Sequence, residues 1–196
     1  MKLTAFAISL AAFLVANAAV ASPDKTDIAT GTAIGERLPQ FTAQITDVSS
    51  GKTVEFDSSK TTHPTVYVFI GTHCPATAAY AERLTELEKT YAAKGVDFIY
   101  LYPNREDTHD AQLAFHAEQK FTARLIDDQG ARLAKLFNAQ RTSELFLVNK
   151  DRVVVYHGAI DDSRDPSGVK QRYLATALDE LLADKPITTA SSLVNA

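Results

Sequence analysis

The one cysteine of the chain, Cys74, stands where the sequence predicts that a buried strand meets a helix. Residues 65–70 are β-branched, aromatic and almost wholly apolar, which is typical of a buried strand. Pro75 suits the first turn of a helix, because its missing N–H costs nothing there. A cysteine in this place faces unpaired amide groups and the positive end of the helix dipole, and both favour thiolate over thiol. The sequence therefore predicts one activated sulfur.

The elements around this cysteine alternate between strands and helices. The turn signal at 49–52 predicts an N-terminal β-hairpin, and the apolar stripe after Pro75 predicts a helix that ends near Gly95. The other expected elements are a strand at 96–102, a helix from Thr108 to about Lys120, a short extended piece at 125–126, a brief helix at 131–137, a hairpin of strands 144–148 and 153–157, and a last helix at 169–182. The strand–helix–strand order implies an α/β fold with a mixed central sheet and helices on both faces.

The first 21 residues have the features of a signal peptide. Lys2 supplies a positive charge, residues 5–15 are apolar but too few to span a membrane, and residues 19–21 form an A-x-A cleavage site. We therefore expect export to the periplasm or the medium and no membrane span. Residues 22–32 are predicted to be a flexible lead and residues 187–196 a loose tail.

Charge and cysteine content narrow the possible functions. The formal net charge is −4, with acidic and basic residues interspersed, which argues against nucleic acid as a partner. An exported chain with one cysteine has no internal disulfide, so the thiol is either buried and inert or reactive toward another molecule. No nucleotide or dinucleotide fingerprint is present, and no cofactor is expected.

The order of elements and the Cys-Pro start of a helix resemble the thioredoxin fold. Residues 35–41 resemble the G-x-x-x-P-x-F lead of redoxins and peroxiredoxins, and residues 69–75 resemble an exported peroxiredoxin-like group with a single F-x-G-T-x-C-P cysteine. Segments 155–162 and 177–182 resemble the same group. The resemblance covers residues 33 to 186 and implies one thioredoxin-like (redoxin) domain.

The sequence departs from these families at three positions. Thr77 stands where thioredoxins carry their second, resolving cysteine, and Val68 stands where they keep a buried acid. Ser143 takes the position of the cis-proline, and a cis bond at serine costs roughly 2.5–4 kcal/mol, so we expect a trans bond and an altered substrate groove. The P-x-x-x-T/S-x-x-C motif of true peroxiredoxins is absent.

The first predicted function is that of a thiol oxidoreductase. The Cys74 thiolate would attack a disulfide or a peroxide, and an external thiol or thioredoxin-like reductant would complete the cycle. Thr77 is expected to donate a hydrogen bond from its hydroxyl to the thiolate. His73 is expected to be the charge partner of the thiolate. The residues expected to contact the substrate are Thr72, Pro75, Thr142 and Ser143.

The second predicted function is that of a binding module without turnover. Such a module would keep the fold and would use the groove, or Cys74 with His73 and His157, to hold a partner or a copper or zinc ion. Titration of the thiol separates the two functions, because a low pKa fits the enzyme and an unshifted, buried sulfur fits the module.

Overall fold

The computed structural model of the protein describes residues 31–192. The predicted signal peptide at 1–21 and nearly all of the predicted lead at 22–32 lie outside the described residues. Thr32, at the end of that lead, donates both its backbone N–H and its hydroxyl to the carbonyl oxygen of Leu136, each at 3.1 Å. Thr32 is therefore already part of the packed domain.

The N-terminal β-hairpin is confirmed. Strands β1 (Thr42–Asp47) and β2 (Lys52–Asp57) pair antiparallel over their whole length. The Asp47 carboxylate fixes the turn between them, because its Oδ1 accepts the backbone N–H of Ser50 at 2.9 Å. A short 3-10 helix, η1 (Ser58–Lys60), follows the hairpin.

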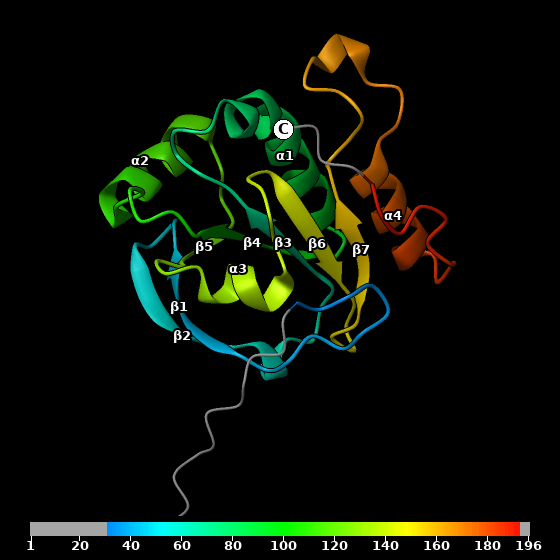
Figure 1. Cartoon of the computed structure of the whole chain (residues 1–196), viewed down its shortest axis with the longest axis horizontal. Helices are drawn as coiled ribbons and strands as arrows, with labels where there is room; N and C mark the ends of the chain where they lie inside the picture. Colours follow the sequence, from blue (N-terminus) through cyan, green and yellow to red (C-terminus); the bar gives the residue numbers. More distant parts are fainter. Residues whose placement is uncertain (1–30, 193–196) are drawn as a thin grey trace, which may run out of the picture.

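In the described part of the chain, seven strands form one sheet in the order β2-β1-β5-β4-β3-β6-β7 (Figure 1). The other five strands are β3 (Thr65–Phe69), β4 (Asp97–Tyr102), β5 (Arg124–Asp127), β6 (Glu144–Val148) and β7 (Val154–Gly158). β3, β4 and β5 run parallel to one another, whereas β1 joins β5 antiparallel and the β6–β7 hairpin joins β3 antiparallel. The predicted mixed sheet is confirmed, and the short extended piece at 125–126 belongs to a strand that links the hairpin to the centre.

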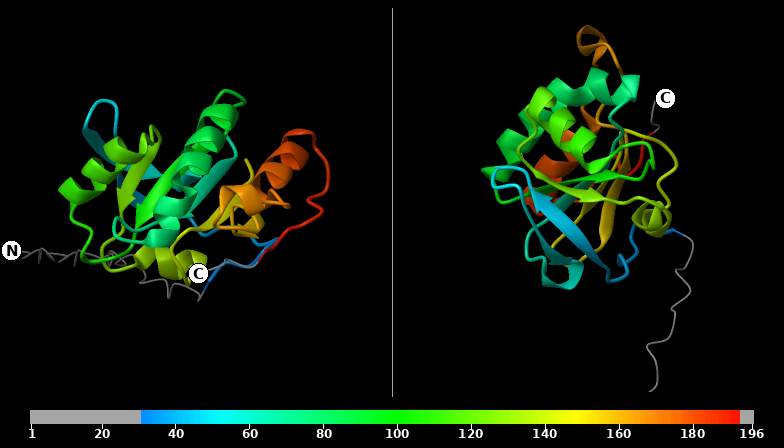
Figure 2. Two further views of the ribbon diagram at one scale, coloured as in Figure 1. Left: turned by 90° about the horizontal axis from the view of Figure 1, so that it is seen from above. Right: turned by 90° about the vertical axis from the view of Figure 1, so that its left-hand side faces the viewer.

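Helices cover both faces of this sheet (Figures 1 and 2). They are α1 (Pro75–Ala92), α2 (His109–Gln119), α3 (Arg132–Phe137), the short 3-10 helix η2 (Pro166–Gly168) and α4 (Tyr173–Leu182). α1, α2 and α4 pack on one face, and α3 packs on the other. None of the helices within residues 31–192 is long and apolar enough to cross a membrane.

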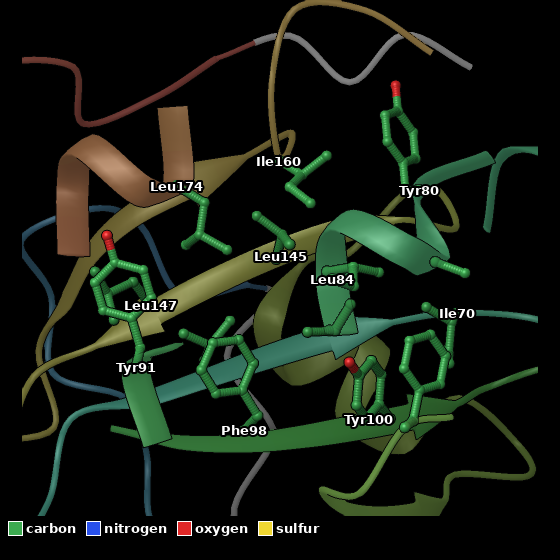
Figure 3. Close-up of a cluster of buried hydrophobic side chains, with 14 of the residues drawn as sticks. Ile70, Tyr80, Leu84, Tyr91, Phe98, Tyr100, Leu145, Leu147, Ile160 and Leu174 are labelled. Atoms are coloured by element: carbon green, nitrogen blue, oxygen red, sulfur yellow. The ribbon is translucent and has the colours of Figure 1, made fainter. Parts of the chain in front are cut away.

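Two hydrophobic cores hold the layers together, one on each face of the sheet. In the first core, Leu84 of α1 and Leu174 of α4 belong to the same buried cluster as Tyr100 and Leu147 of the sheet (Figure 3). In the second core, Phe137 of α3 packs edge-to-face against aromatic rings of β3 and β6. β3 is buried on both faces, so the strand that leads to Cys74 is fixed from both sides.

The last helix begins later than the sequence predicts. It was expected over 169–182 but begins at Tyr173. The Asp162 carboxylate accepts the backbone N–H of Lys170 at 2.9 Å and that of Gln171 at 3.1 Å. A side chain that satisfies these donors in a loop removes the advantage of starting the helix there.

The described end of the predicted tail packs back on the sheet. The N–H of His157 donates to the carbonyl oxygen of Ala190 at 3.0 Å, and the N–H of Ser192 donates to that of His157 at 3.3 Å. Gly158 has a φ of +153°, and a Cβ there would lie 2.4 Å from the Ser192 Oγ. The prediction of a loose segment is therefore wrong for residues 190–192, which we call the C-terminal strap.

Candidate active site

Cys74 lies at the start of α1, where the chain leaves the end of β3. It is the N-cap residue, with an extended backbone (φ −86°, ψ 118°), and Pro75 occupies the first turn. The Cys74 carbonyl oxygen accepts the N–H of Ala78 at 3.2 Å, and the side chain is half-buried. The predicted strand–turn–helix setting of the sulfur is confirmed, and the exposed Pro75 lies beside it.

A hydroxyl from a distant part of the chain contacts the sulfur. Thr142 Oγ1 lies 2.8 Å from Cys74 Sγ, although the two residues are 68 positions apart. The antiparallel pairing of β3 with β6 produces this contact, because it places the loop before β6 beside the turn after β3. The N–H of Ser143 extends that pairing by donating to the carbonyl oxygen of Phe69 at 2.6 Å. Thr142 is predicted from the sequence as a substrate contact, and the structure in addition places its side chain on the sulfur.

The surroundings lower the pKa of the Cys74 thiol. Burial acts in the opposite direction, since it disfavours the charged form and raises the pKa. The hydrogen bond from the Thr142 hydroxyl, the N–H and hydroxyl of Thr77 and the N–H of Ala76 outweigh burial. The net effect is a larger fraction of thiolate at neutral pH, which is the form that reacts with electrophiles.

Thr77 and Ser143, the residues that follow Cys74 by three positions and Thr142 by one, contact each other. Thr77 is buried, and its Oγ1 lies 3.5 Å from the backbone nitrogen of Gly71 and 3.4 Å from Ser143 Oγ. Ser143 has a φ of +65°, and the peptide bond before it is trans, as expected for serine at this position. The residue that replaces a resolving cysteine is therefore packed against the residue that replaces the cis-proline.

Replacing Thr142 by valine tests the hydroxyl contact with little change in shape. We expect Thr142→Val to raise the thiol pKa by about one pH unit, because a hydrogen bond to a charged group is lost. The rate of Cys74 alkylation by iodoacetamide, measured against pH, gives the midpoint. Thr142→Ser keeps the hydroxyl and serves as the control. A midpoint in Thr142→Val equal to that of the parent protein would contradict the contact.

His73 and Thr72 both contact a buried carboxylate, that of Asp107. The His73 side chain is 81% exposed, and its Nδ1 lies 3.6 Å from Asp107 Oδ1. Thr72 donates its backbone N–H to the same oxygen at 3.3 Å, and its hydroxyl contacts that oxygen as well. Asn104 donates to the other oxygen at 3.0 Å. The structure thus places His73 beside Asp107 and not on Cys74, and it anchors the turn before Cys74 to the residues that precede α2.

The sequence did not point to two carboxylates near the site. Asp107 is 2% exposed and Glu144 is 6% exposed. A signal for Glu144 existed, since it is the single charge in the otherwise apolar strand β6. Asp107 has no comparable signal, because it lies in a uniformly polar stretch at 104–110. Val68, which stands where thioredoxins keep a buried acid, belongs to the first hydrophobic core.

The residues proposed for a metal ion do not come together. Within residues 31–192, no group of three or more histidine, cysteine, aspartate or glutamate side chains is placed to hold an ion. His73 contacts Asp107, and His157 Nε2 lies 2.6 Å from Glu144 Oε1. The geometry therefore gives no support to a copper or zinc site built on Cys74 with these histidines.

The fold and the placement of Cys74 define a thioredoxin-like α/β protein: a mixed sheet between helices, with a cysteine at the start of the helix that follows β3. The family model described as Redoxin matches residues 33–173. The chain therefore belongs to the Redoxin family.

Solved structures from several bacteria share this fold. An uncharacterized conserved protein of Geobacillus kaustophilus is 27% identical with a TM-score of 0.72, over 82% of this chain and 88% of that one. A hypothetical protein of Sinorhizobium meliloti is 25% identical with a TM-score of 0.72, over 84% and 92% of the two chains. A secreted disulfide oxidoreductase of Mycobacterium tuberculosis is 19% identical with a TM-score of 0.51, over 74% and 92%. No curated protein matches the chain.

Proposed function

We propose that the protein is an exported thiol oxidoreductase that works through the single sulfur of Cys74. The observation that carries this proposal is the half-buried sulfur at the start of α1, with the Thr142 hydroxyl 2.8 Å away. This arrangement stabilises a thiolate while leaving part of the sulfur accessible to another molecule. Membership of the Redoxin family supports the same conclusion.

With a disulfide substrate, the Cys74 thiolate attacks one of the two sulfurs. A new S–S bond joins Cys74 to that sulfur, the substrate S–S bond breaks, and the second sulfur leaves as a thiolate. An external thiol, as its thiolate, then attacks the mixed disulfide and releases Cys74 as a thiolate again. The reductant is external because the chain has no other cysteine.

With a peroxide substrate, the first step differs but the later ones are shared. The thiolate attacks one oxygen, the O–O bond breaks, and after protonation the products are a Cys74 sulfenic acid and water or an alcohol. An external thiol condenses with the sulfenic acid, releases water and leaves a mixed disulfide, which a second thiol resolves. Thr77 and Thr142 would stabilise the thiolate at the start of either route.

Trapping the Cys74 adduct tests the proposal. Cells that produce the full chain are quenched with a thiol-blocking reagent, and the adduct on Cys74 is identified by mass spectrometry. A mixed disulfide indicates disulfide exchange, and a sulfenic acid captured by a dimedone probe indicates peroxide reduction. Cys74 found only as a free thiol under oxidant stress would contradict both routes.

Export is part of the proposal and is tested separately. The apolar run at 5–15 and the A-x-A site at 19–21 motivate it. We expect the mature protein to begin at Ser22, which N-terminal sequencing of the protein purified from the periplasm or the medium measures. Full-length protein retained in the cytoplasm would contradict it.

Restoring a second cysteine tests whether Thr77 limits disulfide exchange. Thr77 lies one helical turn after Cys74 and is buried beside Ser143. We expect Thr77→Cys to gain insulin reduction in the presence of dithiothreitol, since a C-x-x-C pair can release a mixed disulfide within the chain. Thr77→Ser, which keeps the hydroxyl, is the control. A parent protein already as active as Thr77→Cys would show that this position is not limiting.

A further inference from the structure

The loop that carries Thr142 to the sulfur is held in a conformation that needs outside support. It joins α3 to β6, and Ser143 within it has a φ of +65°. A side chain other than glycine in this left-handed region costs free energy and persists only where surrounding contacts fix it. The contact that fixes the loop after Thr142 is the hydrogen bond from the Ser143 N–H to the carbonyl oxygen of Phe69.

The buried carboxylate of Glu144 fixes the loop before Thr142. Its Oε2 accepts the backbone N–H of Gln140 at 2.6 Å and that of Arg141 at 3.2 Å. Hydrogen bonds from backbone N–H groups to a carboxylate are stronger than those between neutral groups. Thr142 is therefore held on both sides, by Glu144 through its preceding residue and by Phe69 through its following residue.

His157 holds the other oxygen of the same carboxylate. His157 Nε2 lies 2.6 Å from Glu144 Oε1, and the imidazole ring stacks on Phe146 with centroids 4.1 Å apart and planes 9° from parallel. Burial alone raises the pKa of Glu144, but the hydrogen bonds from His157 and from the loop lower it overall. The carboxylate thus stays charged and bonded on both oxygens, which a buried carboxylate requires.

We propose that Glu144 is a positioning residue for Cys74: it clamps the loop at Gln140 and Arg141 so that the Thr142 hydroxyl stays on the sulfur, and His157 secures the clamp. The inference rests on the proposed role of Cys74 as a reactive thiol. Glu144 acts through Thr142, so removing the clamp should reproduce the loss of the Thr142 hydroxyl.

The test compares two changes at Glu144 in the full chain, with iodoacetamide as the probe. Glu144→Met removes both acceptors and should raise the alkylation midpoint of Cys74 by up to about one pH unit, as Thr142→Val does. Glu144→Gln keeps one oxygen for the loop N–H groups and should stay close to the parent protein. In a Thr142→Val background, Glu144→Met should add no further shift, because the hydroxyl that it positions is already gone.

Glu88 provides a matched control. It is also a buried glutamate, and its Oε1 accepts the backbone N–H of Thr122 at 2.8 Å, while Tyr100 donates to its Oε2 at 3.2 Å. Glu88→Met therefore removes a comparable buried network elsewhere, and it should lower stability without moving the midpoint. This comparison separates positioning of Thr142 from a general loss of stability.

The outcomes distinguish the inference from the proposed function. A parent protein whose native Cys74 does not react would defeat the proposed function. A reactive parent with an unchanged midpoint in folded Glu144→Met would overturn the role of Glu144 alone. If Glu144→Met does not fold, His157→Phe, which removes the donor to the Glu144 carboxylate, is measured instead: an upward shift supports the clamp, and an unchanged midpoint overturns it.

Discussion

Replacing Cys74 by serine is expected to abolish every thiol-dependent activity of the protein. No second cysteine exists to take over, and a serine hydroxyl does not ionise near neutral pH. The fold should survive, because Cys74 is half-buried at a helix start and is not a central residue of either core. We expect the free energy of unfolding to change by less than about 1 kcal/mol.

Peroxide consumption and disulfide exchange, each assayed with an external thiol, measure this prediction. The melting temperature of Cys74→Ser is recorded alongside, so that a loss of activity is not confused with a loss of fold. Residual turnover in a folded Cys74→Ser protein would show that the chemistry lies elsewhere. A native Cys74 that iodoacetamide reaches only after denaturation would instead identify the sulfur as structural.

Acidification is expected to destabilise the protein through His116. This residue of α2 is fully buried between the rings of Tyr100, Tyr102 and Phe121. Neither ring nitrogen has a hydrogen-bond partner within residues 31–192. Burial lowers the pKa of His116 from 6.5 to about 4, because the charged imidazole would lose its hydration.

The sign of the effect follows from proton binding. Between pH 6.5 and 4 the unfolded chain binds a proton at His116 that the folded chain does not, so stability falls as the pH falls. From pH 7 to 5 the loss from this residue is about 2 kcal/mol. Urea unfolding at the two pH values measures it, and His116→Leu should lose correspondingly less. His109→Leu, on the same helix, controls for the exchange itself. An equal loss in His116→Leu and in the parent protein would contradict the assignment.

Local chemistry explains how much of the fold was predictable. The turn at Asp47, the buried strand before Cys74 and the proline after it each carry their signal within a few residues. The same holds for Thr108, whose hydroxyl accepts the N–H of Ala111 at 3.3 Å as a helix cap. Strands, helices and the position of the sulfur followed from such signals.

Contacts between distant loops were not predictable in the same way. The Thr142 hydroxyl meets Cys74 only because two strands pair, and the clamp at Glu144 depends on a residue of the next strand, His157. Asp107 reaches Thr72 from 35 positions away. Such contacts depend on how the helices and strands dock, and the spacing of residues in the sequence does not reveal how they dock. The late start of α4 was not predictable either, since one side chain, Asp162, takes up the N–H groups of Lys170 and Gln171 before the helix.

The C-terminal strap has a consequence for aggregation, because it lies along β7, the strand at one edge of the sheet. The unpaired edge of a strand offers N–H and C=O groups to any extended chain, which makes it a template for aggregation. At β7 the strap forms hydrogen bonds with both the N–H and the carbonyl oxygen of His157, so these groups are not available to pair with a second molecule. Gly158 makes the arrangement possible, because any side chain there would push Ser192 away. The missing side chain at Gly158 thus lets the strap cover the backbone groups of His157 at this edge of the sheet.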